Sequence, residues 1–190
     1  MTAFKINFGS MQAKCTSALA LAMLAILSFS SAVVASDLAA DALPTGGQVV
    51  AGEATISQAA ATMNVNQTSQ RAVVNWDSFN VGKNAQVNFN QPNSSAATLN
   101  RVTGASASMI DGAIRANGQV VLVNPNGVTF GKGAEINAAA VVATTMNIAN
   151  KDFMDGKSTY KGNGKGAVVN EGKISVNDPN GYIALLVPEI

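Results

Sequence analysis

The sequence contains no histidine, and its one cysteine, Cys15, lies near the N-terminus. Without histidine a Ser-His-Asp triad cannot form, and most zinc sites lose their usual ligand. Aromatic residues make up 5% of the 190 positions and charged residues 12%, whereas 47% are hydrophobic. These absences exclude common hydrolytic sites and indicate neither a metal nor a cofactor. They favour a protein whose function depends on its shape and surface.

The first 35 residues have the order of a Sec signal peptide. Lys5 and Lys14 precede an apolar run over residues 18–27, and small residues follow as far as Ala35. A charged segment, an apolar segment and a small-residue site are typical of secreted proteins. The apolar run is about half the ~20 residues that a spanning helix needs. We therefore predict cleavage after Ala35, with translation starting at Met1 or Met11.

Cleavage would leave residues 36–190 as one secreted domain without cysteine. Because Lys5 and Lys14 would be removed, 10 of the 12 basic residues would remain against 11 acidic ones, a net charge of −1. This balance argues against nucleic acid as a partner. The missing disulfides suit a chain that must thread a narrow pore while unfolded.

The remainder alternates short apolar runs with Gly- and Asn-containing turns, which is typical of β-strands rather than helices. We predict strands at 48–51, 55–57, 63–66, 73–79, 86–89, 99–102, 109–110, 120–123, 128–130, 134–136, 141–145, 168–169, 174–176 and 182–187. Helix is plausible only over 138–143 and 150–154. Low charge combined with many apolar strands fits a stacked parallel sheet.

A degenerate repeat supports a solenoid. Residues 110–114 (IDGAI) resemble residues 170–174 (NEGKI), and their glycines lie 60 positions apart, which predicts three coils of about 20 residues. In such coils alternate side chains point inward. The inward set predicted from alternation with polar residues is Val87, Phe89, Val120, Leu122, Val128, Phe130, Ile136, Ile174 and Ile183.

Two four-residue turns have the same chemistry: Asn124-Pro125-Asn126-Gly127 and Asp178-Pro179-Asn180-Gly181. Proline presets φ at the second position and glycine suits the fourth, so a type I turn is expected. Both turns can be simple corners between strands, or the first can also be a recognition element. Residues 151–166 differ, since four lysines and four glycines there predict a solvated loop or short hairpin that leaves the solenoid.

An enzyme is the alternative class, because parallel β-helices also occur as polysaccharide lyases and glycosidases. Such a site needs clustered carboxylates. Asp111, Glu135 and Glu171 could approach one another across stacked coils. Scattered surface carboxylates are the commoner meaning of this pattern, so we expect no enzymatic activity.

Several segments, in order, resemble the TPS (haemagglutination-activity) domain of filamentous-haemagglutinin-like two-partner secretion exoproteins. They are LPTGGQVVAG at 43–52, NWDSFNVG at 75–82, LNRV at 99–102, ANG at 116–118, NPNGVTFG at 124–131, VNEGKI at 169–174 and GYIALL at 181–186. Many members carry a second Asn-Pro-Asn motif upstream. The nearest segment here, residues 64–67, lacks the proline, so the role of that motif is not carried over. With its Asn-Trp-x-x-Phe-Asn segment at 75–80, the sequence is closer to the adhesin branch.

The resemblance implies a right-handed parallel β-helix with N-terminal capping strands. It also implies Sec export, then passage through a cognate outer-membrane barrel with periplasmic POTRA domains, to the surface or medium of a Gram-negative bacterium. A downstream passenger would contact a host or cell-surface receptor, so Ile190 would lie within a longer or truncated exoprotein. The residues carried over for secretion or folding are Phe79, Asn100, Arg101, Asn124, Pro125, Asn126 and Gly127. We expect Phe79 to pack the first coils, and Arg101 to pair with a buried carboxylate or cap carbonyl groups.

Overall fold

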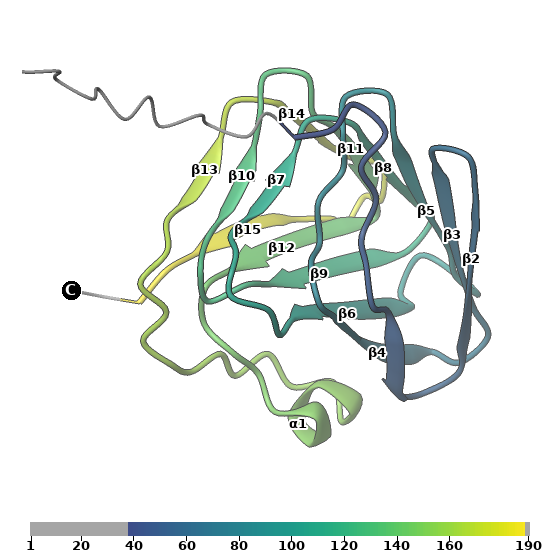
Figure 1. The fold of residues 1–190 in the computed structure, drawn as a ribbon. Coiled ribbons are helices and arrows are strands. Elements are labelled where there is room, and N and C mark those ends of the chain that lie inside the picture. Colours follow the sequence, from purple (N-terminus) through teal and green to yellow (C-terminus); the bar gives the residue numbers. More distant parts are fainter. Residues whose placement is uncertain (1–37, 189–190) are drawn as a thin grey trace, which may run out of the picture. The chain divides into compact units, whose positions relative to one another are not determined.

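The computed structural model describes residues 38–188, which form three β-sheets and one short helix (Figure 1). Sheet 1 contains β1 (Gln48–Ala51), β4 (Arg71–Trp76), β6 (Ala97–Val102), β9 (Gln119–Val123), β12 (Ala140–Thr144) and β15 (Ile183–Leu186). Sheet 2 contains β7 (Ser108–Ile110), β10 (Val128–Phe130) and β13 (Val168–Asn170). Sheet 3 contains β2 (Ala54–Ala59), β3 (Thr62–Gln67), β5 (Gln86–Asn90), β8 (Ala113–Ala116), β11 (Glu135–Ala138) and β14 (Lys173–Val176). The helix is α1 (Asn150–Met154).

The chain winds through the three sheets in turn, so each full coil adds one strand to each sheet. Ala97 pairs with Gln119 and Gln119 with Ala140, which gives coils of 22 and 21 residues. From β4 onward the strands of sheet 1 pair in parallel, as do all three strands of sheet 2. This is the expected parallel β-helix, in which like side chains stack between neighbouring coils.

The N-terminal strands close the first coil. β1 runs antiparallel to β4, and β2 runs antiparallel to β3. These two antiparallel strands, β1 and β2, are the capping strands that the resemblance implied. Residues 1–35, including the predicted signal peptide and both possible starts, lie outside the described residues.

The coil count predicted from the repeat is wrong. Glu135 pairs with Ala113 on one side and with Lys173 on the other, so the two similar segments are two coils apart rather than three. The coil from Glu135 to Lys173 contains more residues than the coil from Ala113 to Glu135, because residues 145–167 leave the β-helix between β12 and β13. We call residues 145–167 the excursion.

The interior is apolar and follows the predicted alternation closely. Seven predicted inward residues are buried: Val87, Phe89, Val120, Leu122, Val128, Phe130 and Ile136. Ile174 is half-buried and packs against this core. Ile183 was predicted inward but is 45% exposed. It pairs with the buried Val141, but β15 is the last strand of sheet 1, so no described coil covers it.

One predicted helix is wrong, one strand was not predicted, and one predicted helix is confirmed. The Ala-rich residues 138–143 form the end of β11 and most of β12 rather than a helix, because parallel pairing with β9 outweighs the helix propensity of alanine. β8 was missed, since its sequence AIRA has few residues typical of strands. The helix at 150–154 is present as α1.

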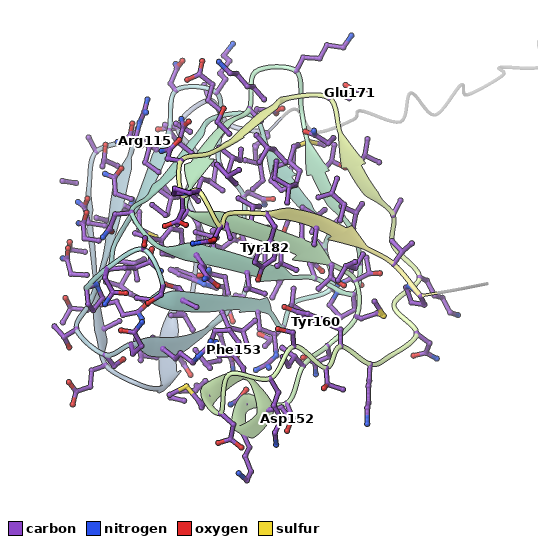
Figure 2. All side chains as sticks on the ribbon, turned by 180° about the vertical axis from the view of Figure 1, so that it is seen from behind. Arg115, Asp152, Phe153, Tyr160, Glu171 and Tyr182 are labelled. Atoms are coloured by element: carbon purple, nitrogen blue, oxygen red, sulfur yellow. The ribbon has the colours of Figure 1, made fainter. Side chains whose placement is uncertain are left out.

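Sheet 1 is apolar on its outer face as well, and the excursion covers part of that face. The outer cluster contains Val73, Ala97, Leu99, Val121, Val123, Val142, Ile148 and Phe153. The guanidinium carbon of Arg71 lies 5.1 Å from the ring centroid of Phe153, a cation–π contact between β4 and α1. Figure 1 shows α1 beside β4, and Figure 2 shows Phe153 on the side of α1 that faces the sheet. No helix in residues 38–188 is long and apolar enough to span a membrane.

Candidate functional site

The Asn124–Gly127 segment forms a tight turn between β9 and β10. The backbone N–H of Gly127 donates to the Asn124 carbonyl at 3.0 Å, and the N–H of Asn126 donates to Asn124 Oδ1 at 3.0 Å. Gly127 has φ +118°, which disfavours any residue with a Cβ. The turn predicted from the sequence is therefore present, with asparagine closing it through its own side chain.

Asn124 also ties the turn to the preceding coil. Its side chain is fully buried, and Nδ2 donates to the Ser106 carbonyl at 3.0 Å and to Ser108 Oγ at 2.9 Å. Asn126, which is exposed, donates from Nδ2 to the Gly104 carbonyl at 2.9 Å. Two side chains of one turn thus satisfy polar groups in the loop between β6 and β7.

The following coil is tied to the same turn through backbone groups. The Asn124 N–H donates to the Thr144 carbonyl at 3.0 Å, and Gly166 donates to the Pro125 carbonyl at 3.1 Å. A Cβ on Gly166 would lie 2.2 Å from the Asn126 carbonyl carbon. The turn therefore connects three successive coils, although Pro125 itself is exposed.

Phe79 and Asn100 lie inside the first two coils. Phe79 is 1% exposed and makes an edge-to-face contact with Trp76, with ring centroids 5.6 Å apart. Trp76 Nε1 donates to Asn100 Oδ1 at 3.0 Å, and Asn100 is completely buried. A buried indole N–H needs such an acceptor, so Asn100 makes the large aromatic pair compatible with the core.

Arg101 faces the other side of sheet 1 and holds the excursion. It donates to the Ile148 carbonyl at 2.6 Å and to the Oδ1 atoms of Asn150 at 2.7 Å, Asn147 at 2.9 Å and Asn75 at 3.2 Å. Burial lowers the pKa of its guanidinium below the ordinary value. Among the described residues no carboxylate pairs with Arg101, so it caps a carbonyl and three amides.

These residues occupy two sides of one sheet. Asn100 pairs with Leu122 and lies on the inner face, while Arg101 pairs with Val123 and lies on the outer face. Asn124 follows Val123 directly and is buried. The sequence segments LNRV and NPNG are therefore neighbours in space, on consecutive coils.

The partners of these residues could not be found from the sequence. Ser106 and Ser108, which accept from Asn124, lie in a Ser- and Ala-rich stretch without any motif. Asn147 and Ile148 are 46 and 47 positions from Arg101. Only the coil register brings such residues together.

The three acidic residues considered for catalysis do not form a linked group. Asp111 and Glu171 lie in corners of different coils, with Gly131 between them, and Glu135 begins β11. Among the described residues none of their carboxylates has a side-chain hydrogen bond or ion pair, and no cluster of acidic residues could hold a metal. Residues 151–166, predicted as a loop or short hairpin leaving the solenoid, carry exposed ion pairs of Lys151 and Lys157 with Asp152 and Asp155.

Comparison with known proteins identifies the family. Residues 40–190 match the profile of the TPS secretion domain. A heme/hemopexin-binding protein of Haemophilus influenzae strain KW20 / Rd is 41% identical over 140 residues, which is 70% of this chain but 15% of that protein. A second heme/hemopexin-binding protein of Haemophilus influenzae is 44% identical over 106 residues, 55% of this chain and 11% of that protein.

A solved structure agrees with the fold. The crystal structure of the HMW1 secretion domain from Haemophilus influenzae has a TM-score of 0.70 and 35% identity, over 75% of this chain and 38% of that one. The comparisons do not favour the lyase or glycosidase alternative. The chain therefore belongs to the TPS secretion domains of two-partner secretion exoproteins.

Proposed function

We propose that residues 36–190 direct export of a larger exoprotein through a cognate outer-membrane barrel with POTRA domains, after Sec delivers the chain to the periplasm. The observation that carries the proposal is the family match over residues 40–190. The protein then reaches the cell surface or the medium of a Gram-negative bacterium. No catalytic turnover is part of this function.

The fold supplies a reason for forward movement. Each coil completes its hydrogen-bond ladders and buries its apolar side chains only against the preceding coil. Coils that fold outside the pore therefore gain free energy in sequence and disfavour backward sliding. In the periplasm the unfolded chain offers strand edges, which a receptor sheet can pair with.

The role proposed for the Asn124–Gly127 turn is folding of the first coils rather than direct recognition. Its buried side chain and its cross-coil hydrogen bonds support this assignment. Phe79, Asn100 and Arg101 act in the same way, through the core and through the excursion. Any effect of these residues on secretion should then follow their effect on stability.

The passenger is proposed to bind a target at the cell surface. The resemblance to the adhesin branch favours an adhesin or haemagglutinin, whereas two relatives are named heme/hemopexin-binding proteins. This chain spans 15% and 11% of the lengths of those proteins. The secretion module is shared by both kinds of exoprotein, so the two passengers need no difference in mechanism here.

Co-expression with and without the partner barrel tests this function. Culture medium should contain the exoprotein only when the barrel is present, and deletion of residues 43–102 should abolish secretion. The variant Asn124→Ala should lower both secretion and thermal stability, whereas its matched control Asp178→Ala should leave secretion unchanged and lower thermal stability only slightly. Release without any barrel would refute the export role. Loss of secretion in Asn124→Ala without loss of stability would instead assign the turn to direct recognition.

A further inference from the structure

The sequence contains four Asn-Gly pairs: Asn117-Gly118, Asn126-Gly127, Asn163-Gly164 and Asn180-Gly181. This dipeptide is chemically labile, because the backbone nitrogen of the glycine can attack the side-chain carbonyl carbon of the asparagine. Glycine favours the attack, since it has no Cβ to hinder the approach and its backbone rotates freely. All four asparagines are exposed, so access to water does not distinguish the pairs.

Three of the four pairs are locked by a hydrogen bond from the glycine N–H, the group that must attack. The donors and acceptors are Gly118 N–H to Gln91 Oε1 at 2.8 Å, Gly127 N–H to the Asn124 carbonyl at 3.0 Å, and Gly181 N–H to the Asp178 carbonyl at 2.8 Å. Attack requires loss of the N–H proton and rotation of the nitrogen toward the side chain. Each of these hydrogen bonds must therefore break before the pair can react.

The pair Asn163-Gly164 is the exception. Among the hydrogen bonds of residues 38–188, none is made by the Gly164 N–H or by the Asn163 side chain. The pair lies where the excursion returns from α1 to β13 (Figure 1), in residues 162–167, which form neither helix nor strand. Both residues line a cleft of about 640 Å³, so water reaches the pair.

Two positive charges flank this pair. Lys161 and Lys165 are both exposed, two positions before Asn163 and two positions after it. The attacking nitrogen is an anion once its proton is removed, and a nearby positive charge favours an anion. Because both ammonium groups are in solvent, their contribution is modest. The unbonded N–H remains the main difference between this pair and the other three.

We propose that Asn163 is a site of spontaneous deamidation. The Gly164 nitrogen loses its proton to hydroxide and forms a bond to Asn163 Cγ, the bond from Cγ to Nδ2 breaks, and the amide group takes up a proton and leaves as ammonia. Water then opens the resulting succinimide ring at either carbonyl group. One opening gives aspartate, and the other gives isoaspartate, in which the main chain runs through the side chain. Each conversion consumes one water and releases one ammonia, and no oxidation occurs.

The isoaspartate product has one more methylene group in its main chain, and the excursion is fixed on both sides of it. Before the pair, Asn147 and Lys161 exchange two backbone hydrogen bonds, each of 2.7 Å. After the pair, the Gly166 N–H donates to the Pro125 carbonyl at 3.1 Å. A longer chain between these two attachments must bulge outward or break one of them.

The inner side of this segment has no room for a bulge. A Cβ on Gly164 would collide with the Thr145 carbonyl oxygen, so the main chain already lies against the first residue of the excursion. We therefore expect isoaspartate to loosen the returning part of the excursion, which covers the apolar outer face of sheet 1. Deamidation would then act as a slow, one-way change that uncovers this face as the protein ages.

Peptide mapping by mass spectrometry tests the site in the secreted protein, aged in heavy-oxygen water at neutral and mildly alkaline pH. Asn163 should convert about tenfold or more faster than Asn117, Asn126 and Asn180, because those pairs react only after local opening. The rate at Asn163 should rise with pH, since hydroxide removes the N–H proton. In urea all four rates should become similar, because the dipeptide is the same and the protecting hydrogen bonds are lost.

The variant Asn163→Gln should stop conversion at this position, because its longer side chain would have to close a larger, less favourable ring. The side chain is exposed, so the fold should be unchanged. Asn180→Gln alters another exposed pair and is the matched control, which should leave the rate at Asn163 unchanged. Equal rates at the four asparagines of the folded protein would overturn the assignment. It would also be overturned if Asn163 stayed intact while the protein in urea converted.

Limited proteolysis tests the consequence. Aged wild type should be cut within residues 145–167 faster than fresh protein, whereas aged Asn163→Gln should be cut at the fresh rate. Freshly purified Asn163→Asp carries the charge without the added methylene group and should resemble fresh wild type, because an exposed charge contributes little. Equal cutting of fresh and isoaspartate-containing protein would overturn the loosening. Asn163→Gln should be secreted like wild type through the partner barrel, so these outcomes do not depend on the export function.

Discussion

The two Pro-Asn-Gly turns are closed by the same pair of hydrogen bonds but have different surroundings. In each, the glycine N–H donates to the carbonyl of the first residue, at 3.0 Å for Gly127 and 2.8 Å for Gly181. In each, the N–H of the third residue donates to the side chain of the first, at 3.0 Å in the first turn and 2.9 Å in the second. The turn chemistry read from the sequence therefore does not distinguish them.

Their first residues make the difference. Asn124 is fully buried and donates two further hydrogen bonds into the preceding coil, whereas Asp178 is half-buried in a corner of the last described coil. An amide can accept from the turn and donate to the coil below, but an ionised carboxylate can only accept. The comparison teaches that a turn becomes important for the solenoid when its side chains also join coils.

The largest expected effect is the loss of the Asn124 side chain. Asn124→Ala removes three hydrogen bonds, to Ser108 Oγ, to the Ser106 carbonyl and from the Asn126 N–H, and leaves a cavity beside the buried Ser108, so we expect the free energy of unfolding to fall by about 3 kcal/mol. Asp178→Ala removes the matching group from the other turn, where it makes no bond like those of Asn124 to the preceding coil, and should lower the free energy of unfolding only slightly. Urea unfolding of the secreted protein measures both. Equal losses would mean that turn closure, not coil joining, explains the motif.

The sequence predicted the coil strands well because one-face burial imposes strict alternation, as in Val87 and Phe89 of β5. It failed where the answer depends on neighbours in space. The apolar Ile183 is exposed because β15 is an edge strand, and the alanines at 138–143 are in strands because β9 pairs with them. The site was predicted as separate motifs. The side-chain hydrogen bonds that join it to other coils and to the excursion span 16 to 49 positions and follow only from coil register.

The excursion is held by two kinds of polar contact, those of the half-buried Arg101 and those of the exposed Lys157. Arg101→Met keeps the apolar stem of the side chain but removes four hydrogen bonds to residues of the sheet and excursion, so we expect a loss of about 2 kcal/mol in the free energy of unfolding. Lys157→Met removes two exposed ion pairs within the excursion and should change nothing measurable.

Limited proteolysis sharpens this result, because a released excursion should be cut within residues 145–167 in Arg101→Met but not in Lys157→Met. If Arg101→Met resisted proteolysis as well as the wild type does, the apolar packing of Ile148 and Phe153 would be sufficient to hold the excursion.

A smaller effect is expected at the third turn position. Asn126 is exposed, but its Nδ2 donates to the Gly104 carbonyl and to Asn124 Oδ1, so Asn126→Ala should lower the free energy of unfolding by about 1 kcal/mol. Asn180 has no side-chain hydrogen bond among the described residues, and Asn180→Ala is the matched control. Thermal unfolding of the pair measures the difference. A larger loss in Asn180→Ala would reverse the ranking of the two turns.

The smallest expected effect is a pH dependence present in one turn only. A hydrogen bond from Ser94, and a second from the Asn180 N–H, lower the pKa of Asp178 below its ordinary value. A carboxyl group with a lowered folded-state pKa stabilises the protein above its unfolded pKa of about 3.9, and this contribution is lost as the pH falls through the folded value.

Asp178→Asn keeps the bond to Asn180 N–H, as Asn124 does in the other turn, but removes the charge. The melting temperature of wild type should therefore exceed that of Asp178→Asn slightly at neutral pH, and the gap should close on acidification below about pH 4. A gap that widens in acid would mean that the neutral, protonated form of Asp178 is the one the fold prefers, and that the hydrogen bond from Ser94 does not stabilise the charged carboxylate.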